Sequence, residues 1–483
     1  MSIPGSSLDL PLGSLTIRDA DPEETRTLAA RPHVDSLTLP DELLAEIFSY
    51  GSSGVEDYRD ADVIAPNATR AQAAFLVAAV CQRWRAAALA ASRLWHYILI
   101  PRFSVNARSS YSNRVCSYLD VVLLRSRSVP IDIMFQYVED VAPPDEFGPI
   151  FSALREHQYR WRRFLARVRG RLPIVALLEC LQGPTPLLRT LQLTQQRDSL
   201  CWGYAVDDMD SVHLDGRSSE PPISQPILSD APSLIWVSIV NIPDIIRSTI
   251  ISPAARPQGL EYFADRQNPA IWNMLRGNTQ LEQLTLGTWP TDGAADRVEP
   301  IELQQVFRLW LTQGAFQLVA NQPDLLVLPK LDTLTMVHSE LRGMESFLVR
   351  VQSTLTFLDL RHVDSLDAAD IEVLAAMPYI AQLQLGEATL PDLWLERLCH
   401  VPSSLKNWQK LMWRWLFNFT LYSCKVESVE LRRLVDLAKM RRVAQTDETK
   451  PTWRQVFFRL TDNEVPQDQL DEIKALPGIT VVV

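Results

Sequence analysis

The pattern of apolar and polar positions predicts a short amphipathic helix at the start of the stretch from Leu37 to Trp95. Four apolar residues there recur at the spacing that places them on one face of a helix with 3.6 residues per turn. Pro40 suits the first helical turn, and Asp41 and Glu42 complement the positive end of the helix dipole. The four apolar residues are Leu43, Leu44, Ile47 and Phe48.

The end of the same stretch, from about residue 73 to Trp95, is rich in alanine and favours helix. Its apolar stripe consists of Leu76, Val80, Trp84 and Ala88, with Arg83 and Arg85 on either side of the tryptophan. Two short amphipathic helices cannot bury their apolar faces alone, so they need a neighbour. On periodicity alone, that neighbour is the rest of the same chain.

A short apolar unit, L-x-x-L-x-L, recurs further along the chain. It occurs as PLLRTLQL, TQLEQLTL, PKLDTLTM, STLTFLDL and PYIAQLQL, and more weakly as PSLIWVSI and GLEYFAD. The last three clear copies start 24 and 25 residues apart, within the period of about 20–29 residues that is typical of leucine-rich repeats. Each unit predicts one short strand with inward leucines, then a helical return, and stacking buries a continuous core. The predicted fold class is therefore α/β, with short parallel strands and helical returns.

The repeats are irregular. Steps of 46 and 50 residues predict insertions or degenerate copies at 194–232 and 287–328. We interpret residues 300–319 as a repeat helix and the polar, acidic segment at about 194–226 as a long loop. The inward side chains of the repeat helix are expected to be Leu303, Val306, Phe307, Trp310 and Leu311.

Before the repeats, a helical face around Tyr118–Leu123 precedes a predicted strand at 130–135, and a second helix follows at about 151–161. Residues 161–169 fit either a strand with one basic face or a helix, and periodicity leaves both open. At the other end of the chain, three tryptophans at 408–415 and a basic helix at about 428–442 predict a unit that caps the array.

The identities of the residues in the first stretch carry a resemblance. L-P-x-E-L-L-x-x-I-F, then V-C-x-x-W-R and a final L-W, is similar to the F-box, a small helical module. The connection between the two predicted helices is longer than the usual short form and resembles that of the fungal, mushroom-type F-box family. The matching positions are Leu39, Pro40, Glu42, Leu43, Leu44, Ile47, Phe48, Val80, Cys81, Trp84, Arg85, Leu94 and Trp95.

The resemblance implies a binding role. F-box modules dock on a Skp-type adaptor and, through it, on a cullin ubiquitin ligase, while other subunits perform the covalent chemistry. The residues that the resemblance assigns to the adaptor surface are Leu39, Pro40, Leu43, Leu44, Ile47, Phe48, Val80, Cys81 and Trp84.

Composition narrows the choice of partners. The chain has 483 residues, 47% apolar content and a net charge of −11, so no overall field attracts nucleic acid or an anionic membrane. No uncharged apolar run approaches the ~18–20 residues of a membrane span, and the N-terminus lacks the pattern of a secretory signal. Six scattered cysteines indicate reduced thiols, so we expect a cytoplasmic or nuclear protein.

Motifs for catalysis, cofactors and metals are not found in the sequence. It contains no GxGxxG or GxxxxGKS loop and no HExxH spacing, and the aspartates at 207–215 fail the EF-hand pattern. We therefore expect no cofactor, no metal and no catalytic residue. Two basic stretches, at 160–171 and 432–442, fit either a patch for an acidic partner or, more simply, a solvated face.

We therefore predict three parts: a flexible arm at 1–36, an F-box-like helical module at 37–103, and a leucine-rich-repeat-like solenoid at 104–483. The expected function is that of a substrate receptor in a Skp-cullin-F-box ligase, with an unknown protein substrate bound by the array. The alternative is a leucine-rich interaction scaffold that never engages a ubiquitin ligase.

Overall fold

The computed structural model describes a large part of the chain. The described ranges are residues 39–52, 67–100, 111–136, 147–169, 177–196, 230–242, 255–263, 269–287, 299–337, 343–362, 368–387 and 418–422, the strands at 456–459 and 479–482, and a few single positions. The predicted arm at 1–36, the long loop and the capping helix with its tryptophans lie outside them. The chain divides into two compact units, Met1–Ala176 and Leu177–Val483.

The described part of the first unit starts with the helices α1 (Asp41–Ser52), α2 (Ala68–Val80) and α3 (Gln82–Ala90) and a 3₁₀ turn, η2 (Ser92–Trp95). The helix predicted over Leu43–Phe48 is therefore confirmed. The single helix predicted from about residue 73 onward is wrong, because the chain is extended at Cys81, with φ −157° and ψ 170°. Its apolar stripe is split accordingly: Ala88 is buried, whereas Leu76 and Val80 are exposed.

Three strands follow in this unit, β1 (Tyr97–Ile100), β2 (Ile131–Gln136) and β3 (Trp161–Arg169). They pair in parallel in chain order, and the returns between them contain α4 (Tyr111–Ser126) and α5 (Phe147–Arg155), with the 3₁₀ turn η5 (Gln158–Arg160) before β3. The segment at 161–169, for which periodicity allowed a helix or a strand, is a strand.

The sheet of the first unit is covered on both faces. On one face, Phe135 of β2 contacts the rings of Phe147 and Phe151 in α5. On the other face, Ala68 and Ala71 of α2 pack against a buried apolar cluster from all three strands. That cluster consists of Tyr97, Leu99, Met134 and Leu165. The small alanine side chains let α2 approach the strands closely.

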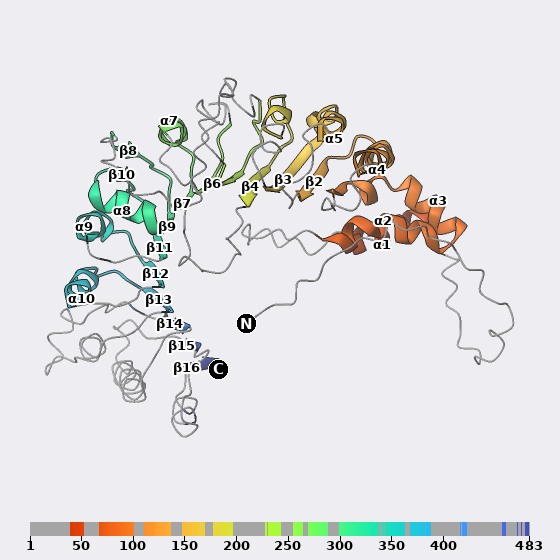
Figure 1. The fold of residues 1–483 in the computed structure, drawn as a ribbon. Helices are drawn as coiled ribbons and strands as arrows, with labels where there is room; N and C mark the ends of the chain where they lie inside the picture. Colours follow the sequence, from red (N-terminus) through yellow and green to blue (C-terminus); the bar gives the residue numbers. More distant parts are fainter. Residues whose placement is uncertain are drawn as a thin grey trace. The chain divides into compact units, whose positions relative to one another are not determined.

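The second unit is a stack of short parallel strands that follow one another in chain order, with helices α7, α8, α9 and α10 on one side of them (Figure 1). The strands are β4 (Thr190–Gln196), β5 (Trp236–Val240), β6 (Gly259–Phe263), β7 (Gln283–Gly287), β9 (Arg308–Thr312), β11 (Thr333–Val337), β12 (Phe357–Arg361), β13 (Gln382–Gly386), β14 (Asn418–Tyr422), β15 (Val456–Arg459) and β16 (Ile479–Val482). The helices are α7 (Pro269–Gly277), α8 (Gln313–Asn321), α9 (Glu345–Val351) and α10 (Ala368–Ala375), and β8 (Ile301–Glu302) pairs with β10 (Leu326–Val327). Both units thus have the predicted α/β class.

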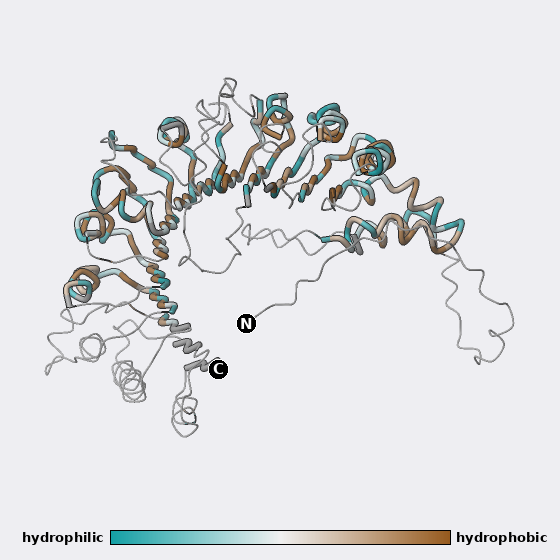
Figure 2. The backbone as a smooth tube through the Cα atoms, in the orientation of Figure 1, coloured by the Kyte–Doolittle hydropathy of each residue, from teal (hydrophilic) through white to brown (hydrophobic). Residues whose placement is uncertain are grey.

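The repeating leucines define this stack. Leu334, Leu358 and Leu383 stand in register on β11, β12 and β13 and are fully buried. Side chains alternate between apolar and polar along these strands (Figure 2), because successive residues of a strand point to opposite faces. Hydrogen bonds also join neighbouring repeats. The carbonyl of the residue before one strand accepts two successive backbone N–H groups at the start of the next strand, as Phe307 does from Asp332 and Thr333 at 3.0 and 2.9 Å.

The helix predicted at 300–319 is wrong. Residues 308–312 form β9, which pairs with β7 and β11, and α8 starts only at Gln313. The step of 50 residues is thus two steps of 25, measured from Gln283 to Arg308 and from Arg308 to Thr333 in the register. Leu309 and Leu311 point inward as the repeat requires. Leu303 and Val306, which precede β9, added apolar residues at helical spacing, and this spacing led to the wrong prediction of a helix.

The turns after the strands share one backbone conformation. Asn241, His362 and Glu387 directly follow β5, β12 and β13, and each has a positive φ of 52° to 56°. Asparagine and histidine adopt this left-handed conformation more readily than most non-glycine residues, whereas it is uncommon for glutamate. Nδ1 of His362 lies 2.6 Å from Oε2 of Glu387, so neighbouring turns are linked by side chains.

Candidate functional site

The nine residues that the F-box resemblance singles out lie on or beside α1 and the α2–α3 junction, but at different depths. Leu44 and Phe48 are buried within the chain itself, and Leu39 and Trp84 are half-buried. The remaining five are exposed: Pro40, Leu43, Ile47, Val80 and Cys81. The predicted apolar stripe of α1 therefore has an inward pair, Leu44 and Phe48, and an outward pair, Leu43 and Ile47.

The inward pair holds the helices together. The ring of Phe48 lies 4.9 Å from the ring of Trp84, centroid to centroid, so Trp84 contributes to the internal packing as well as to the surface. Arg83 of α3 ties down the start of α1, because its Nε donates to Asp41 Oδ1 at 3.0 Å and its Nη2 to the Leu39 carbonyl.

Cys81 separates α2 from α3 and caps the second of them. Its sulfur accepts the backbone N–H of Trp84 at 3.4 Å, and its carbonyl accepts that of Arg85 at 2.9 Å. The side chain thus takes the N-cap role that serine, threonine, aspartate or asparagine usually fills. Because cysteine is not among these preferred residues, α3 has no standard start signal in the sequence.

Exposed apolar side chains concentrate on these helices. Among the residues that the structure describes, fourteen large hydrophobic side chains are strongly exposed, and seven of them belong to α1, α2 or α3. Apolar groups gathered in this way mark interaction sites on soluble proteins. Three of the seven, Tyr50, Phe75 and Leu89, are positions that the sequence reasoning did not select. The seven are Leu43, Ile47, Tyr50, Phe75, Leu76, Val80 and Leu89.

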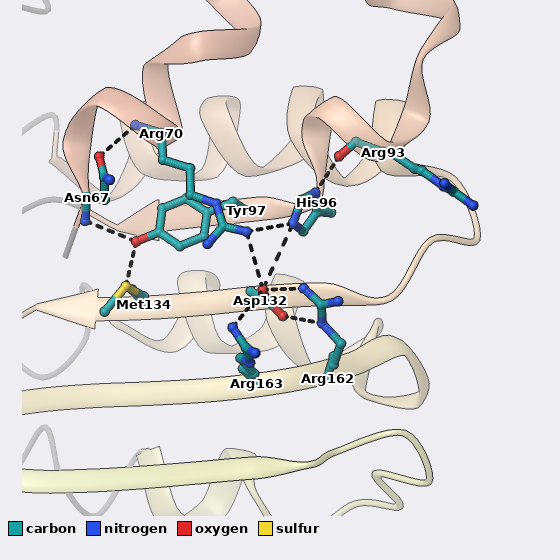
Figure 3. Close-up of polar contacts among 9 residues, drawn as sticks. All are labelled: Asn67, Arg70, Arg93, His96, Tyr97, Asp132, Met134, Arg162 and Arg163. Carbon is teal, nitrogen blue, oxygen red and sulfur yellow. Dashed lines mark hydrogen bonds and ion pairs between the residues drawn. The ribbon is translucent and has the colours of Figure 1, made fainter. Parts of the chain in front are cut away.

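A buried polar cluster, the Asp132 cluster, links α2 to the sheet (Figure 3). Asp132 of β2 is 2% exposed. Its carboxylate receives both Arg162 Nε and Arg162 Nη2, at 2.8 and 2.5 Å. Three further nitrogens lie close to Oδ2, namely Arg70 Nη2 at 3.9 Å, Arg163 Nη1 at 3.9 Å and His96 Nε2 at 4.0 Å. One acid thereby joins side chains from α2, β3 and the η2–β1 connection.

A local irregularity allows two successive arginines to reach this acid. The pairing of β2 with β3 shifts by one residue between Ile131 and Asp132, so that Arg162 is the extra residue on β3. Such a bulge changes the direction of side chains in a strand. Side chains that would otherwise alternate between the two faces therefore both approach Asp132.

The first turn of α2 also contacts β1 close to the Asp132 cluster, through Asn67 and Arg70. Asn67 caps the helix by accepting the Arg70 N–H on Oδ1 at 2.9 Å, and its own N–H donates to the Tyr97 hydroxyl at 3.1 Å. That hydroxyl donates to the sulfur of Met134 at 2.6 Å. The Arg70 guanidinium lies over the Tyr97 ring, 4.4 Å from its centroid.

Burial and the contact with Arg70 favour the neutral form of His96. Its Nε2 lies 3.0 Å from Arg70 Nη2, which can only donate, and its Nδ1 bonds the Arg93 carbonyl, which can only accept. Burial lowers the pKa of His96 below its usual value, and the charges of Arg70 and Arg162 act in the same direction. Asp132 and the bond to Arg93 oppose this effect.

The basic stretch at 160–171 is used largely inside the chain where the structure describes it. Arg162 and Arg163 belong to the Asp132 cluster, and Arg160 is buried, with its Nη2 donating to Ser126 Oγ at 2.9 Å. Ser126 ends α4, so this guanidinium complements the negative end of that helix. The second basic stretch, at 432–442, lies outside the described residues.

The described part of the chain lacks two features. It contains no group of three or more His, Cys, Asp or Glu side chains arranged to hold a metal ion. It also contains no helix that is long and apolar enough to cross a membrane.

Comparison with known proteins gave no assignment: no protein-family model matches the chain, and no curated protein matches it.

Proposed function

We propose that the chain is a substrate receptor of a Skp-cullin-F-box type ubiquitin ligase. In this proposal α1–α3 are an F-box that docks on a Skp-type adaptor and, through it, on a cullin. The strand stack is an irregular leucine-rich-repeat solenoid that holds a protein substrate. The chain then supplies proximity and orientation, which alone can accelerate a reaction greatly, and needs no catalytic residue of its own.

The observation that carries this proposal is the outward placement of apolar motif residues. Leu43, Ile47 and Val80 are 49%, 54% and 61% exposed, although their side chains are among the most apolar. Leaving such groups in water costs free energy that a partner surface recovers. The same positions are those at which F-box modules meet their adaptor, according to the resemblance of the sequence.

The substrate-binding part of the proposal is supported by the even spacing of the strands along the chain. The first paired residues of seven successive strands lie 23 to 25 residues apart, within the period of leucine-rich repeats. Repeats of this kind present extended surfaces to partners. These residues are Trp236, Gly259, Gln283, Arg308, Thr333, Phe357 and Gln382.

The test is co-purification of the full chain with a Skp-type adaptor, with the affinity measured by calorimetry. The variant is the double substitution Leu43→Asp, Val80→Asp, because both side chains are exposed and contribute little to the internal core. Trp84 is less suitable, since its loss also removes the contact with Phe48. Each anchor is worth about 2 kcal/mol, so we expect the Kd to rise at least about 100-fold.

The matched control is Leu124→Asp. Leu124 is 79% exposed on α4, so the same chemical change there should leave adaptor binding unaltered. Equal binding by the double variant would mean that Leu43 and Val80 are not the docking residues. If the wild type does not bind the adaptor, the receptor function is wrong. The chain would then be better described as a leucine-rich interaction scaffold outside the ubiquitin system.

A further inference from the structure

Helix α2 exposes apolar residues on one side and packs on the sheet with the other. Leu76 and Val80 are exposed to solvent, whereas Ala68 and Ala71 pack on strands β1–β3. Ala74 is also buried, and the ring of Phe75 lies 5.1 Å from that of Trp95, but apolar contact is not directional. A helix held only in this way could rotate or slide on the sheet, so its orientation requires another source.

Directional contacts are present at the start of the helix. Arg70 approaches three partners at once: the His96 ring nitrogen, the Asp132 carboxylate and the face of the Tyr97 ring. The Arg70 side chain is 9% exposed and that of Asp132 is 3% exposed, so solvent screens their attraction only weakly. The planar guanidinium of arginine also fixes the angle of approach in a way that a lysine ammonium does not.

We propose that Arg70 is a positioning residue, which fixes the orientation of α2 on strands β1–β3 through Asp132, His96 and Tyr97. The docking helices and the first three strands thereby form one rigid body. The functional value of this fixed orientation rests on the proposed function, because an adaptor bound to α1–α3 then takes a defined orientation relative to strands β1–β3. The orientation itself is a property of the isolated chain and is testable without an adaptor.

The experiment measures the distance between α2 and α5 by electron spin resonance. Spin labels on unnatural amino acids at Thr69 and Ser152, two exposed positions, leave the native cysteines in place. We expect one narrow distance distribution for the full-length wild type and a broadened one for Arg70→Met. Hydrogen exchange of the α2 amides should become about tenfold faster in this variant, while exchange in β2 and β3 stays unchanged.

Two variants complete the design. Arg276→Met makes the same change at a cation that forms an exposed pair with Glu299 in the second unit, and it should leave the narrow distribution unaltered. Arg70→Lys keeps the charge near Asp132 but not the planar contacts, and it remains informative if Arg70→Met does not fold. It should broaden the distribution as well, since the planar guanidinium is lost.

The outcomes separate the two proposals. If both Arg70 variants keep the narrow distribution and the slow exchange of α2, the inference is overturned. The apolar packing of α2 and the bond from Asn67 to Tyr97 then suffice to orient the helix. Failure of the wild type to bind the adaptor overturns the proposed function but leaves the distance measurement valid. If the adaptor binds Arg70→Met with normal affinity and the distances broaden, Arg70 acts on orientation and not on docking.

Discussion

At the scale of single residues, His96 links the fold to pH. In the folded chain its Nε2 accepts a bond from Arg70 at 3.0 Å, while Asp132, Arg70 and Arg162 are the charged groups that face it. Protonation would place an N–H against the Arg70 guanidinium and add a positive charge beside it. The lowered pKa of His96 expresses this cost together with the cost of desolvating the charge.

The first residue-scale prediction follows from the sign of this shift. The unfolded state takes up a proton near pH 6.5 and the folded state only at lower pH, so stability falls as the pH decreases through about 6.5 and becomes constant below the folded pKa. In His96→Gln the group at this position no longer titrates. We therefore expect a smaller loss of unfolding free energy between about pH 7.5 and about pH 5.5, measured by urea denaturation.

His157 provides the internal comparison. Burial lowers its pKa too, so it contributes pH dependence of the same sign in both proteins and cancels in their difference. Equal pH dependence of the wild type and His96→Gln would mean that His96 is readily protonated in the folded chain. Burial of the imidazole and its contact with Arg70 (Figure 3) would then not disfavour the charged form.

The sequence predicted single residues of this site only in part. It identified Leu43, Leu44, Ile47 and Phe48 as one apolar stripe, but it could not divide the stripe into a buried and an exposed pair. That division depends on which face of α1 packs against Trp84 of α3. The Asp132 cluster was not predicted at all, because Arg70 and Asp132 are far apart in the chain and are brought together only by the packing of α2 on β2.

At the scale of elements, neighbouring strands of the second unit interlock through a glycine. A Cβ atom added at Gly259 in β6 would lie 1.9 Å from the ring of Trp236 in β5. The indole of Trp236 thus fills the space that a side chain at position 259 would need. A similar arrangement recurs one strand further, where the ring of Phe263 occupies the space beside Gly287.

The element-scale prediction is that Gly259→Ala destabilises the chain by about 1–3 kcal/mol, because the indole must leave its position. The matched control is Gly148→Ala in α5, where an added Cβ meets no atom within 4 Å. There alanine should change the free energy of unfolding by no more than about 0.5 kcal/mol, because Gly148 lies in the first turn, directly before Pro149, and not in the helix interior. Urea denaturation of both variants checks this difference, and a stable Gly259→Ala protein would show that Trp236 moves without cost.

The elements themselves were predictable where their signal was local. The L-x-x-L-x-L units became strands in register, because alternating leucines need no distant information to define an inward face. The break at Cys81 escaped prediction, since a cysteine cap between two alanine-rich segments looks like continuous helix. Strand β9 escaped too, because Leu303, Val306 and Trp310 add apolar positions at helical spacing.

At the scale of the whole molecule, the stack of the second unit should respond locally to damage. Each strand pairs only with its neighbours, so stability is approximately a sum of nearest-neighbour terms. Leu358 is fully buried in the middle of β12, between β11 and β13. Leu358→Ala removes buried apolar volume and should cost about 2–5 kcal/mol.

We expect the effect of Leu358→Ala to stay close to its origin. Hydrogen exchange measured by mass spectrometry should rise in β11, β12 and β13, while α1–α3 of the first unit keep their protection. Adaptor binding should then remain at the wild-type level, because the proposed docking residues belong to the other compact unit. If exchange rises equally in α1–α3, the two units unfold as one, and the separation of docking and substrate binding between them is not supported by their stability.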